Sequence, residues 1–136
     1  IMIGAAAAQG LQKINPPGLS APQTYTHVVR AGNIAFIAGQ VGTDAQGKLA
    51  GSGMREQTEQ VLRNLQTALA SQKIDFSHVA KITIFTTSIE EFRAADVAAV
   101  RAKYLGEARP ASTLVQVSRL ASPEFKIEIE AIAVVP

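Results

Sequence analysis

The last apolar segment of the chain, residues 125–135, constrains the fold more than any other segment. It alternates with the period of two residues that is typical of a β-strand. One face of this strand is apolar throughout and carries Phe125, Ile127, Ile129, Ala131 and Ala133. The other face is mixed and carries Lys126, Glu128, Glu130, Ile132 and Val134. A face in simple contact with solvent would stay polar along its length, so this second face is expected to be covered as well.

Two further segments have the period of amphipathic helices, and helices on one side of a sheet cover only one of its faces. The second face must then be covered by something else, and the economical candidate is another copy of the chain. The sequence therefore predicts an oligomer in which Glu128 and Glu130 lie close to a cleft between subunits.

The remaining elements follow from periodicity and turn signals. Residues 11–24 are predicted to be an irregular lead-in. Strands are predicted at 25–31 and 34–38, joined by a hairpin turn at Gly32-Asn33, and a tight turn is predicted at 44–47. A helix is predicted at about 54–71, with Glu59 and Arg63 paired four residues apart on its outer surface. A strand at 79–87, a second helix from Ser88 to about Gly106 and a strand at 110–117 precede the last strand. This order of elements predicts one α+β domain.

Composition excludes several classes of protein. The chain has 136 residues, of which 47% are hydrophobic and 18% charged, so it can build a core and is not of the disordered class. The net charge is only +2 and the basic residues are scattered, which argues against a nucleic-acid partner. The absence of cysteine excludes disulfides and thiolate catalysis. His27 and His78 are not at metal-ligand spacing and are predicted to lie on the surface. No apolar run reaches the roughly 20 residues of a membrane helix.

The first residues have two interpretations. Residues 1–20 are predicted to be an N-terminal extension or a processed segment, and residues 21–136 the folded domain. The small residues of the first ten positions are compatible with the end of a cleaved secretory signal, although no basic region precedes them. We expect a cytoplasmic protein, with a periplasmic or secreted one as the alternative if this segment is a signal remnant.

From about Tyr25 onward the chain resembles the RidA (YjgF) family, whose older names are L-PSP endoribonucleases and translation inhibitors. The resemblance rests on four groups of residues: Gly32-Asn33 with Ala38-Gly39-Gln40, Asn64-Leu65, Arg109-Pro110-Ala111-Ser112, and the segment from Lys126 to Val134. It implies a chorismate-mutase-like α+β domain with a mixed sheet packed on two helices, assembled as a homotrimer with clefts between subunits.

The resemblance also implies an activity. Well-known members of the family hydrolyse reactive enamines and imines to 2-keto acids and ammonia, without a cofactor or a metal. In such sites an arginine binds the substrate carboxylate through two hydrogen bonds, and a glutamate positions a water molecule against the imine carbon. The resemblance thus predicts a small-molecule ligand in the subunit cleft.

Residue by residue, the match to the family's site is mixed. The tyrosine corresponds to Tyr25 and the water-positioning glutamate to Glu128, which are the catalytic candidates. The substrate-binding candidates are Gly39, Ala38 in place of a serine, Asp96 in place of an asparagine, Ser112 in place of the arginine, and Leu114 in place of a small polar residue or a thiol.

The missing arginine puts the standard 2-imino acid reaction in doubt. A charge-assisted hydrogen-bond pair contributes about 1.5–3 kcal/mol, so its loss weakens the binding of a substrate carboxylate by roughly 10- to 100-fold. Arg109 lies three residues from Ser112, and side chains along a strand alternate, so Arg109 is predicted to be a surface or trimer-edge residue instead.

Three functions therefore stay open: a variant imine or enamine hydrolase, a trimer that binds a small metabolite without turnover, and, with the least support, an RNA-cleaving protein. The individual residues also have structural alternatives. Glu128 is alternatively an ion-pair partner of a basic residue, and Glu130 is expected to form a structural ion pair. The alternatives for the others are an aromatic residue at a strand end for Tyr25, an interface contact for Asp96 and a passive replacement for Ser112.

Overall fold

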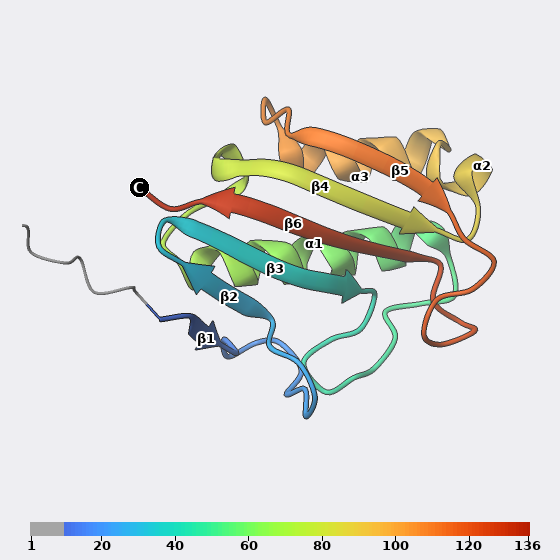
Figure 1. The fold of residues 1–136 in the computed structure, drawn as a ribbon. Coiled ribbons are helices and arrows are strands. Elements are labelled where there is room, and N and C mark those ends of the chain that lie inside the picture. Colours follow the sequence, from blue (N-terminus) through green and yellow to red (C-terminus); the bar gives the residue numbers. More distant parts are fainter. Residues whose placement is uncertain (1–9) are drawn as a thin grey trace, which may run out of the picture.

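Six strands form one mixed sheet in the order β1-β2-β3-β6-β4-β5 (Figure 1). The computed structural model describes residues 10–136. The strands are β1 (Gln12–Ile14), β2 (Val28–Ala31), β3 (Ile34–Val41), β4 (Val79–Thr86), β5 (Ala111–Gln116) and β6 (Ile127–Val134). β6 lies between β3 and β4 and is antiparallel to both, whereas β4 and β5 are parallel. The last strand of the sequence is therefore central in the sheet, which agrees with the apolar face and the mixed face predicted for it.

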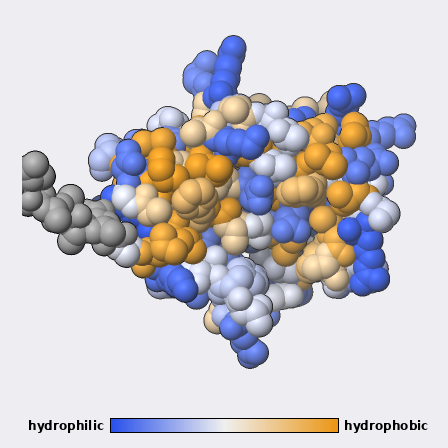
Figure 2. All heavy atoms as spheres, viewed as in Figure 1, coloured by the Kyte–Doolittle hydropathy of each residue, from blue (hydrophilic) through white to orange (hydrophobic). Residues whose placement is uncertain are grey.

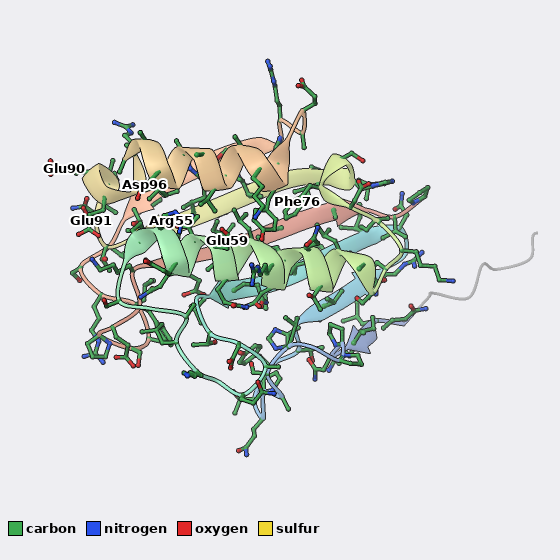
Figure 3. All side chains as sticks on the ribbon, turned by 180° about the vertical axis from the view of Figure 1, so that it is seen from behind. Arg55, Glu59, Phe76, Glu90, Glu91 and Asp96 are labelled. Atoms are coloured by element: carbon green, nitrogen blue, oxygen red, sulfur yellow. The ribbon has the colours of Figure 1, made fainter. Side chains whose placement is uncertain are left out.

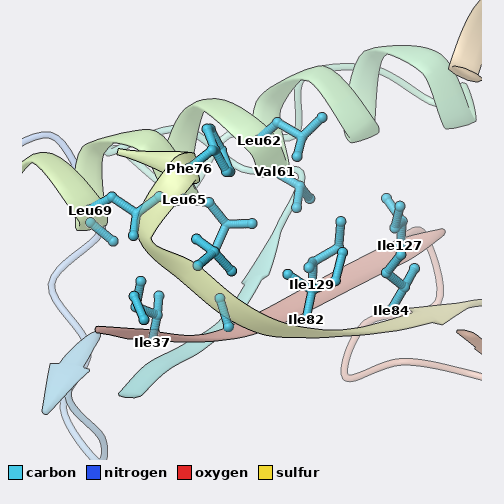
Figure 4. Packing of buried hydrophobic residues seen from close by; sticks show 14 of the residues in the cluster. Ile37, Val61, Leu62, Leu65, Leu69, Phe76, Ile82, Ile84, Ile127 and Ile129 are labelled. Atoms are coloured by element: carbon cyan, nitrogen blue, oxygen red, sulfur yellow. The ribbon is translucent and has the colours of Figure 1, made fainter. Parts of the chain in front are cut away.

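The helices all lie on one face of this sheet, behind it in Figure 1 and in front of it in Figure 3. They are α1 (Met54–Ala70), α2 (Ile89–Phe92) and α3 (Ala95–Leu105), with a 3₁₀ turn, η1 (Phe76–His78), before β4. The predicted apolar stripe of α1 is buried, and it packs on the apolar face of β6 (Figure 4). The fully buried side chains at this contact include Val61, Leu62, Leu65, Leu69, Ile127 and Ile129.

The predicted pair of Glu59 and Arg63 is present and forms part of a link between α1 and α3. Glu59 Oε1 lies 3.6 Å from Nη2 of Arg63 and accepts hydrogen bonds from Tyr104 Oη at 2.7 Å and Lys103 Nζ at 3.0 Å. These contacts lower the pKa of Glu59, with the bond from Tyr104 as the largest cause. The two longer helices are thus held together by ionic groups on the outside and by the shared core on the inside.

The second predicted helix is wrong in one respect, because it is broken. Ser88 caps α2 as expected, its Oγ accepting from the backbone of Glu91 at 3.2 Å, and the helical segment ends at Gly106, which has a φ of 52°. Between them α2 stops after Phe92, and the backbone at Ala94 has a ψ of 146°, outside the helical region. The sheet is therefore covered by three helices instead of two.

Two predictions near the N-terminus also change. The irregular lead-in contains the short strand β1, which pairs with β2, and Leu19 belongs to the core. The strand predicted to start at Tyr25 starts only at Val28. The hairpin at Gly32-Asn33 is confirmed. The possible signal remnant falls largely on residues 1–9, which lie outside the described residues.

The ladder between β3 and β6 contains an irregularity that positions the site. Ile37 pairs with Ala131 and Gln40 with Ile129, so two residues of β3, Ala38 and Gly39, stand opposite Glu130 alone. One extra residue of this kind is a β-bulge, which bends the strand and re-aims its side chains. As a result Ile37 and Gln40 both face the helices, and each is only 3% exposed.

The face of the sheet that turns away from the helices is left open by the described residues. Figure 2 shows hydrophobic side chains gathered on it between charged ones. Phe36 is 47% exposed and Val134 39%, and Val115 on β5 is also exposed. This confirms that the helices cover only one face, and it leaves the partner of the other face as a proposal.

Candidate functional site

A hollow of about 370 Å³ opens on this second face, at the end of the β3–β6 pair. We call it the open-face hollow. It is lined by Tyr25, Ala38, Gly39, Val41, Ala121, Phe125 and Glu128. The structure therefore brings together four of the predicted site residues, which are Tyr25, Ala38, Gly39 and Glu128. They come from the loop before β2, from the bulge in β3 and from the start of β6.

Glu128 lies directly against the backbone of Gly39. A Cβ atom built at position 39 would stand 2.8 Å from Cδ of Glu128 and closer still to its Oε1, and its three nearest atoms all belong to that side chain. Only glycine leaves this space empty. The bulge and the glycine together thus form a niche in which the carboxylate rests against the main chain.

The electrostatic surroundings of Glu128 favour its neutral form. Burial raises the pKa of the carboxyl group, and the charge of Glu130 on the same face raises it further. Neither glutamate forms an ion pair with any residue in the range 10–136. A half-buried carboxylate without a cationic partner, on the wall of a hollow, has the properties that general bases require.

The prediction that His27 lies on the surface is wrong. His27 is 3% exposed, its Nε2 lies 2.8 Å from the carbonyl oxygen of Ser20, and its Nδ1 lies 3.1 Å from Nε2 of Gln40. These two contacts together require the Nε2–H tautomer, which donates to Ser20 and accepts from Gln40. The ring of Tyr25 packs edge-on against it at 5.5 Å between centroids. His27 thus packs against the ring of Tyr25 and helps to hold it in place.

Sequence reasoning missed the amides that hold the loops around the hollow. Asn64 donates to the carbonyl oxygens of Val41 at 3.1 Å and Thr43 at 2.9 Å. Gln57, which is fully buried, donates to Glu124 O at 2.9 Å and accepts from Lys126 N at 2.8 Å. The available signal was a polar residue on the apolar stripe of a helix, which must find partners in the interior.

Ser112 and Leu114 lie on the other side of the sheet. Ser112 pairs with Ile82 and Leu114 with Ile84, and side chains of paired residues share a face. Both isoleucines are buried beneath the helices, and Leu114 packs against the same core. Glu128 pairs with Phe85 and faces the opposite way. One chain therefore does not bring Ser112 or Leu114 to the open-face hollow. Arg109 is exposed, as predicted.

Asp96 is also remote from Glu128. It was expected on the apolar stripe of one continuous helix, but the break after Phe92 turns it outward. Asp96 is exposed in the first turn of α3, where its Oδ1 accepts from the backbone of Val97 at 2.9 Å. Figure 3 shows it with Arg55 and Glu91 at one end of the helix layer, where all three line a surface hollow.

Residues 10–136 contain neither a metal-ligating cluster nor a membrane-spanning helix. No group of three potential metal-ligating side chains is close enough to hold an ion. No helix in that range is both long and apolar enough to cross a membrane.

The fold and the open-face hollow define a class of small α+β proteins. In this class the candidate site contains a glutamate side chain and lies on the sheet face that the helices leave uncovered. The family model for Endoribonuclease L-PSP matches residues 17–135, and the chain belongs to this family, also known as the RidA or YjgF family.

Individual relatives agree with this assignment. The chain is 38% identical over 110 residues to a RutC family protein of Pyrococcus horikoshii, covering 80% of this chain and 85% of that one. It is 32% identical over 119 residues to a human 2-iminobutanoate/2-iminopropanoate deaminase, covering 87% and 83%. Among solved structures, E. coli TdcF with bound serine superimposes with a TM-score of 0.80 at 27% identity, covering 90% and 98%.

Proposed function

We propose that this protein is an imine or enamine hydrolase in which Glu128 positions and activates a water molecule. The observation that carries the proposal is the setting of Glu128: it lines the open-face hollow, rests against Gly39, lacks an ionic partner among the described residues and has a raised pKa. The names of relatives, a human 2-iminobutanoate/2-iminopropanoate deaminase and an Arabidopsis Reactive Intermediate Deaminase A, support this class of reaction.

The reaction proceeds in two proton-coupled steps. The Glu128 carboxylate takes a proton from water while the water oxygen bonds to the carbon of the protonated imine, and the C=N electron pair moves to nitrogen to give a neutral amino alcohol. The carboxyl group then gives its proton to the amino group. When the C–N bond breaks, Glu128 takes the hydroxyl proton, so that ammonia and a carbonyl product leave and the remaining proton passes to ammonia. A carboxyl group whose pKa is raised toward neutral pH is better suited both to take a proton from water and to return it to the amino group.

The substrate class differs from that of an imino acid held by a strand arginine, because position 112 is serine. The opposite orientation of Ser112 and Glu128 supports the proposal that a second copy completes the site. β5 is an edge strand of the sheet, so another copy can approach it with its own open face. We propose a homotrimer in which each cleft combines the edge of one sheet with the open-face hollow of the next, and in which the ligand is a small molecule.

The test is hydrolysis of 2-iminopropanoate, generated in situ, and of an imine without a carboxylate. Glu128→Gln is expected to lower kcat/KM by about 100-fold or more with the fold intact. Glu130→Gln is the matched control on the same face and should retain most of the activity. Ser112→Arg should raise activity on 2-iminopropanoate by roughly 10- to 100-fold. Full activity in Glu128→Gln would contradict the proposed role.

A second candidate is a trimer that binds a small metabolite without turnover. The bound serine in TdcF favours it, because that structural relative holds an amino acid. Under this alternative, the wild-type protein hydrolyses neither imine, and Glu128→Gln changes only the affinity for the ligand. Nucleic-acid cleavage has no comparable support beyond the family's older name.

A further inference from the structure

A second hollow, of about 260 Å³, adjoins the open-face hollow, and we call it the inner hollow. Its walls come from the loop before β2, the end of β3, the loop after β3, α1 and Phe125. The inner hollow and the open-face hollow have four wall residues in common, which are Tyr25, Gly39, Val41 and Phe125. The two hollows are therefore adjacent, and one ligand with two substituents can reach both.

One buried side chain at the inner hollow has an unused hydrogen-bond acceptor. Gln40 is 3% exposed, and its Nε2 donates to the carbonyl oxygen of Ala38 at 2.9 Å and to Nδ1 of His27 at 3.1 Å. These bonds use both amide protons and fix the orientation of the amide, because a carbonyl oxygen can only accept. Oε1 of Gln40 receives no hydrogen bond from any residue in the range 10–136. A buried acceptor is rarely left without a donor, so this oxygen is suited to accept from a molecule that enters the hollow.

Two hydroxyl groups at the same hollow are also unused. Ser20 and Thr43 both line it, and each uses only its backbone carbonyl oxygen. That of Ser20 lies 2.8 Å from Nε2 of His27, and that of Thr43 lies 2.9 Å from Nδ2 of Asn64. Neither hydroxyl forms a hydrogen bond within the part of the chain that the structure describes. A hydroxyl group can donate or accept, so the hollow offers one acceptor, on Gln40, and two adaptable partners.

The inner hollow carries no formal charge that could pair with an ion. No lysine, arginine, aspartate or glutamate lines it, and both ring nitrogens of His27 are engaged, with Ser20 and Gln40. A charged group would lose its hydration there without gaining a partner. The ligand group is thus neutral, and it must donate to Gln40 and accept from a hydroxyl group. A primary carboxamide does both, whereas a carboxylate has no proton to donate.

We propose that the inner hollow binds a neutral carboxamide group, whose N–H donates to Oε1 of Gln40 and whose carbonyl oxygen accepts from Ser20 or Thr43. The shared walls place such a group next to the hollow of Glu128, so the substrate imine is one that carries a carboxamide substituent. This assignment to the substrate rests on the proposed hydrolase, whereas binding of a carboxamide alone does not. No residue of β5 takes part in the inner hollow.

Butanamide is the probe, titrated into the wild-type protein while the side-chain amide of Gln40 and the methyl group of Thr43 are followed by NMR. Pentan-2-one keeps the shape and the carbonyl oxygen, but a methyl group replaces the amide nitrogen. Saturable shifts are expected with butanamide, and pentan-2-one should bind about 10-fold more weakly, because Oε1 of Gln40 stays unpaired. Butanoate, which is charged, should also bind more weakly. Equal or tighter binding of either analogue, or no saturable shifts with butanamide at roughly 20 mM, would overturn the proposal.

Variants test the two kinds of partner. Ser20→Ala combined with Thr43→Val removes both hydroxyl groups and should weaken butanamide binding by about 2- to 10-fold. Thr67→Val is the matched control, because Thr67 lies on α1 and does not line the hollow. Gln40→Met should lower the affinity for butanamide to that for pentan-2-one. Gln40 also holds the bulge, so the wild-type comparison decides the question if this variant fails to fold. Unchanged affinity in the folded double variant would contradict the assigned contacts.

The hydrolysis assay connects the inner hollow to the proposed reaction. The imine 4-iminobutanamide, generated in situ from 4-aminobutanamide, should have a kcat/KM about 10-fold above that of butan-1-imine. A protein that binds butanamide but hydrolyses no imine would refute the hydrolase and support the carboxamide site. A protein that hydrolyses both imines equally, and binds pentan-2-one as well as butanamide, would support the hydrolase and refute the carboxamide site.

Discussion

Two hollows on opposite sides of the sheet differ in charge, in depth and in the origin of their walls. The open-face hollow is wide and shallow, is lined by loops and by a bulge, and presents a carboxylate. The helix-side cavity, of about 140 Å³ between α1, α3, β4 and β5, is small, is lined by helices and strands, and presents the guanidinium group of Arg101. Because the sheet separates them, Glu128 and Arg101 do not neutralise each other. Both charges thus remain available to molecules from outside the chain.

The strongest test of this separation is removal of His27, which supports only the open-face side. His27→Ala deletes a buried ring and two hydrogen bonds, and we expect the free energy of unfolding to fall by about 2–4 kcal/mol. Imine hydrolysis should fall with it, because Tyr25 loses its support. Urea unfolding and the imine hydrolysis assay measure the two effects.

His78→Ala is the matched control for that substitution. His78 is partly exposed and contacts Asp75 at 3.1 Å on the surface, so its removal should cost much less stability. If both histidine variants lost the same stability, the buried network around His27 would not have the importance that its contacts indicate.

An intermediate effect is expected at Gly39, where the niche for Glu128 can be tested directly. Gly39→Ala places a methyl group where the end of the Glu128 side chain lies, and we expect a cost of about 1 kcal/mol, at the low end of overpacking, because a flexible side chain can move aside. Because all three nearest atoms belong to Glu128, the same substitution in a Glu128→Ala background should cost far less. A double-mutant cycle of unfolding free energies measures this coupling. An equal cost in both backgrounds would mean that the backbone, and not the carboxylate, requires glycine.

The smallest effect concerns the pH dependence of stability. The pKa of Glu128 is raised in the folded protein, so its ionised form destabilises the fold above that pKa, and protonation relieves this as the pH falls. Glu128→Gln should therefore be more stable than the wild type at pH 7. The difference should vanish below a pH of about 4, where the carboxyl is neutral in both states.

Unfolding curves at several pH values measure this difference between the two proteins. Glu107→Gln is the control, because Glu107 is exposed in the loop after α3. A stability difference for Glu128→Gln that did not depend on pH would point to packing instead of charge.

The features that follow from periodicity were predictable from the sequence. The stripe of α1, the central position of β6 and the location of Glu128 on a mixed face all depend on side chains that repeat along one element. The break between α2 and α3 was not predictable, because Arg93 and Ala94 are good helix formers and carry no local signal for the end of a helix. β1, with three residues, is too short to show a period.

The candidate site was predictable only in part, for a related reason. Tyr25, Gly39 and Glu128 meet because the bulge and a loop bring them together, and the resemblance to a family supplied their positions. The burial of His27 depends on Gln40, thirteen residues away, turning inward beyond the bulge. The cavity at Arg101 is lined by several elements that are far apart in the chain, among them α1, β4, α3 and β5, and no local pattern indicates it.

The bulge at Ala38 and Gly39 also sets which changes of length this strand can tolerate. Elsewhere in β3, removal of one residue would turn every following side chain to the wrong face. At the bulge, removal of one residue leaves Ile37 and Gln40 two positions apart and both facing the helices, as regular alternation requires. A single deletion there keeps the core in register and eliminates only the niche of Glu128, so the fold and the site can be lost independently of each other.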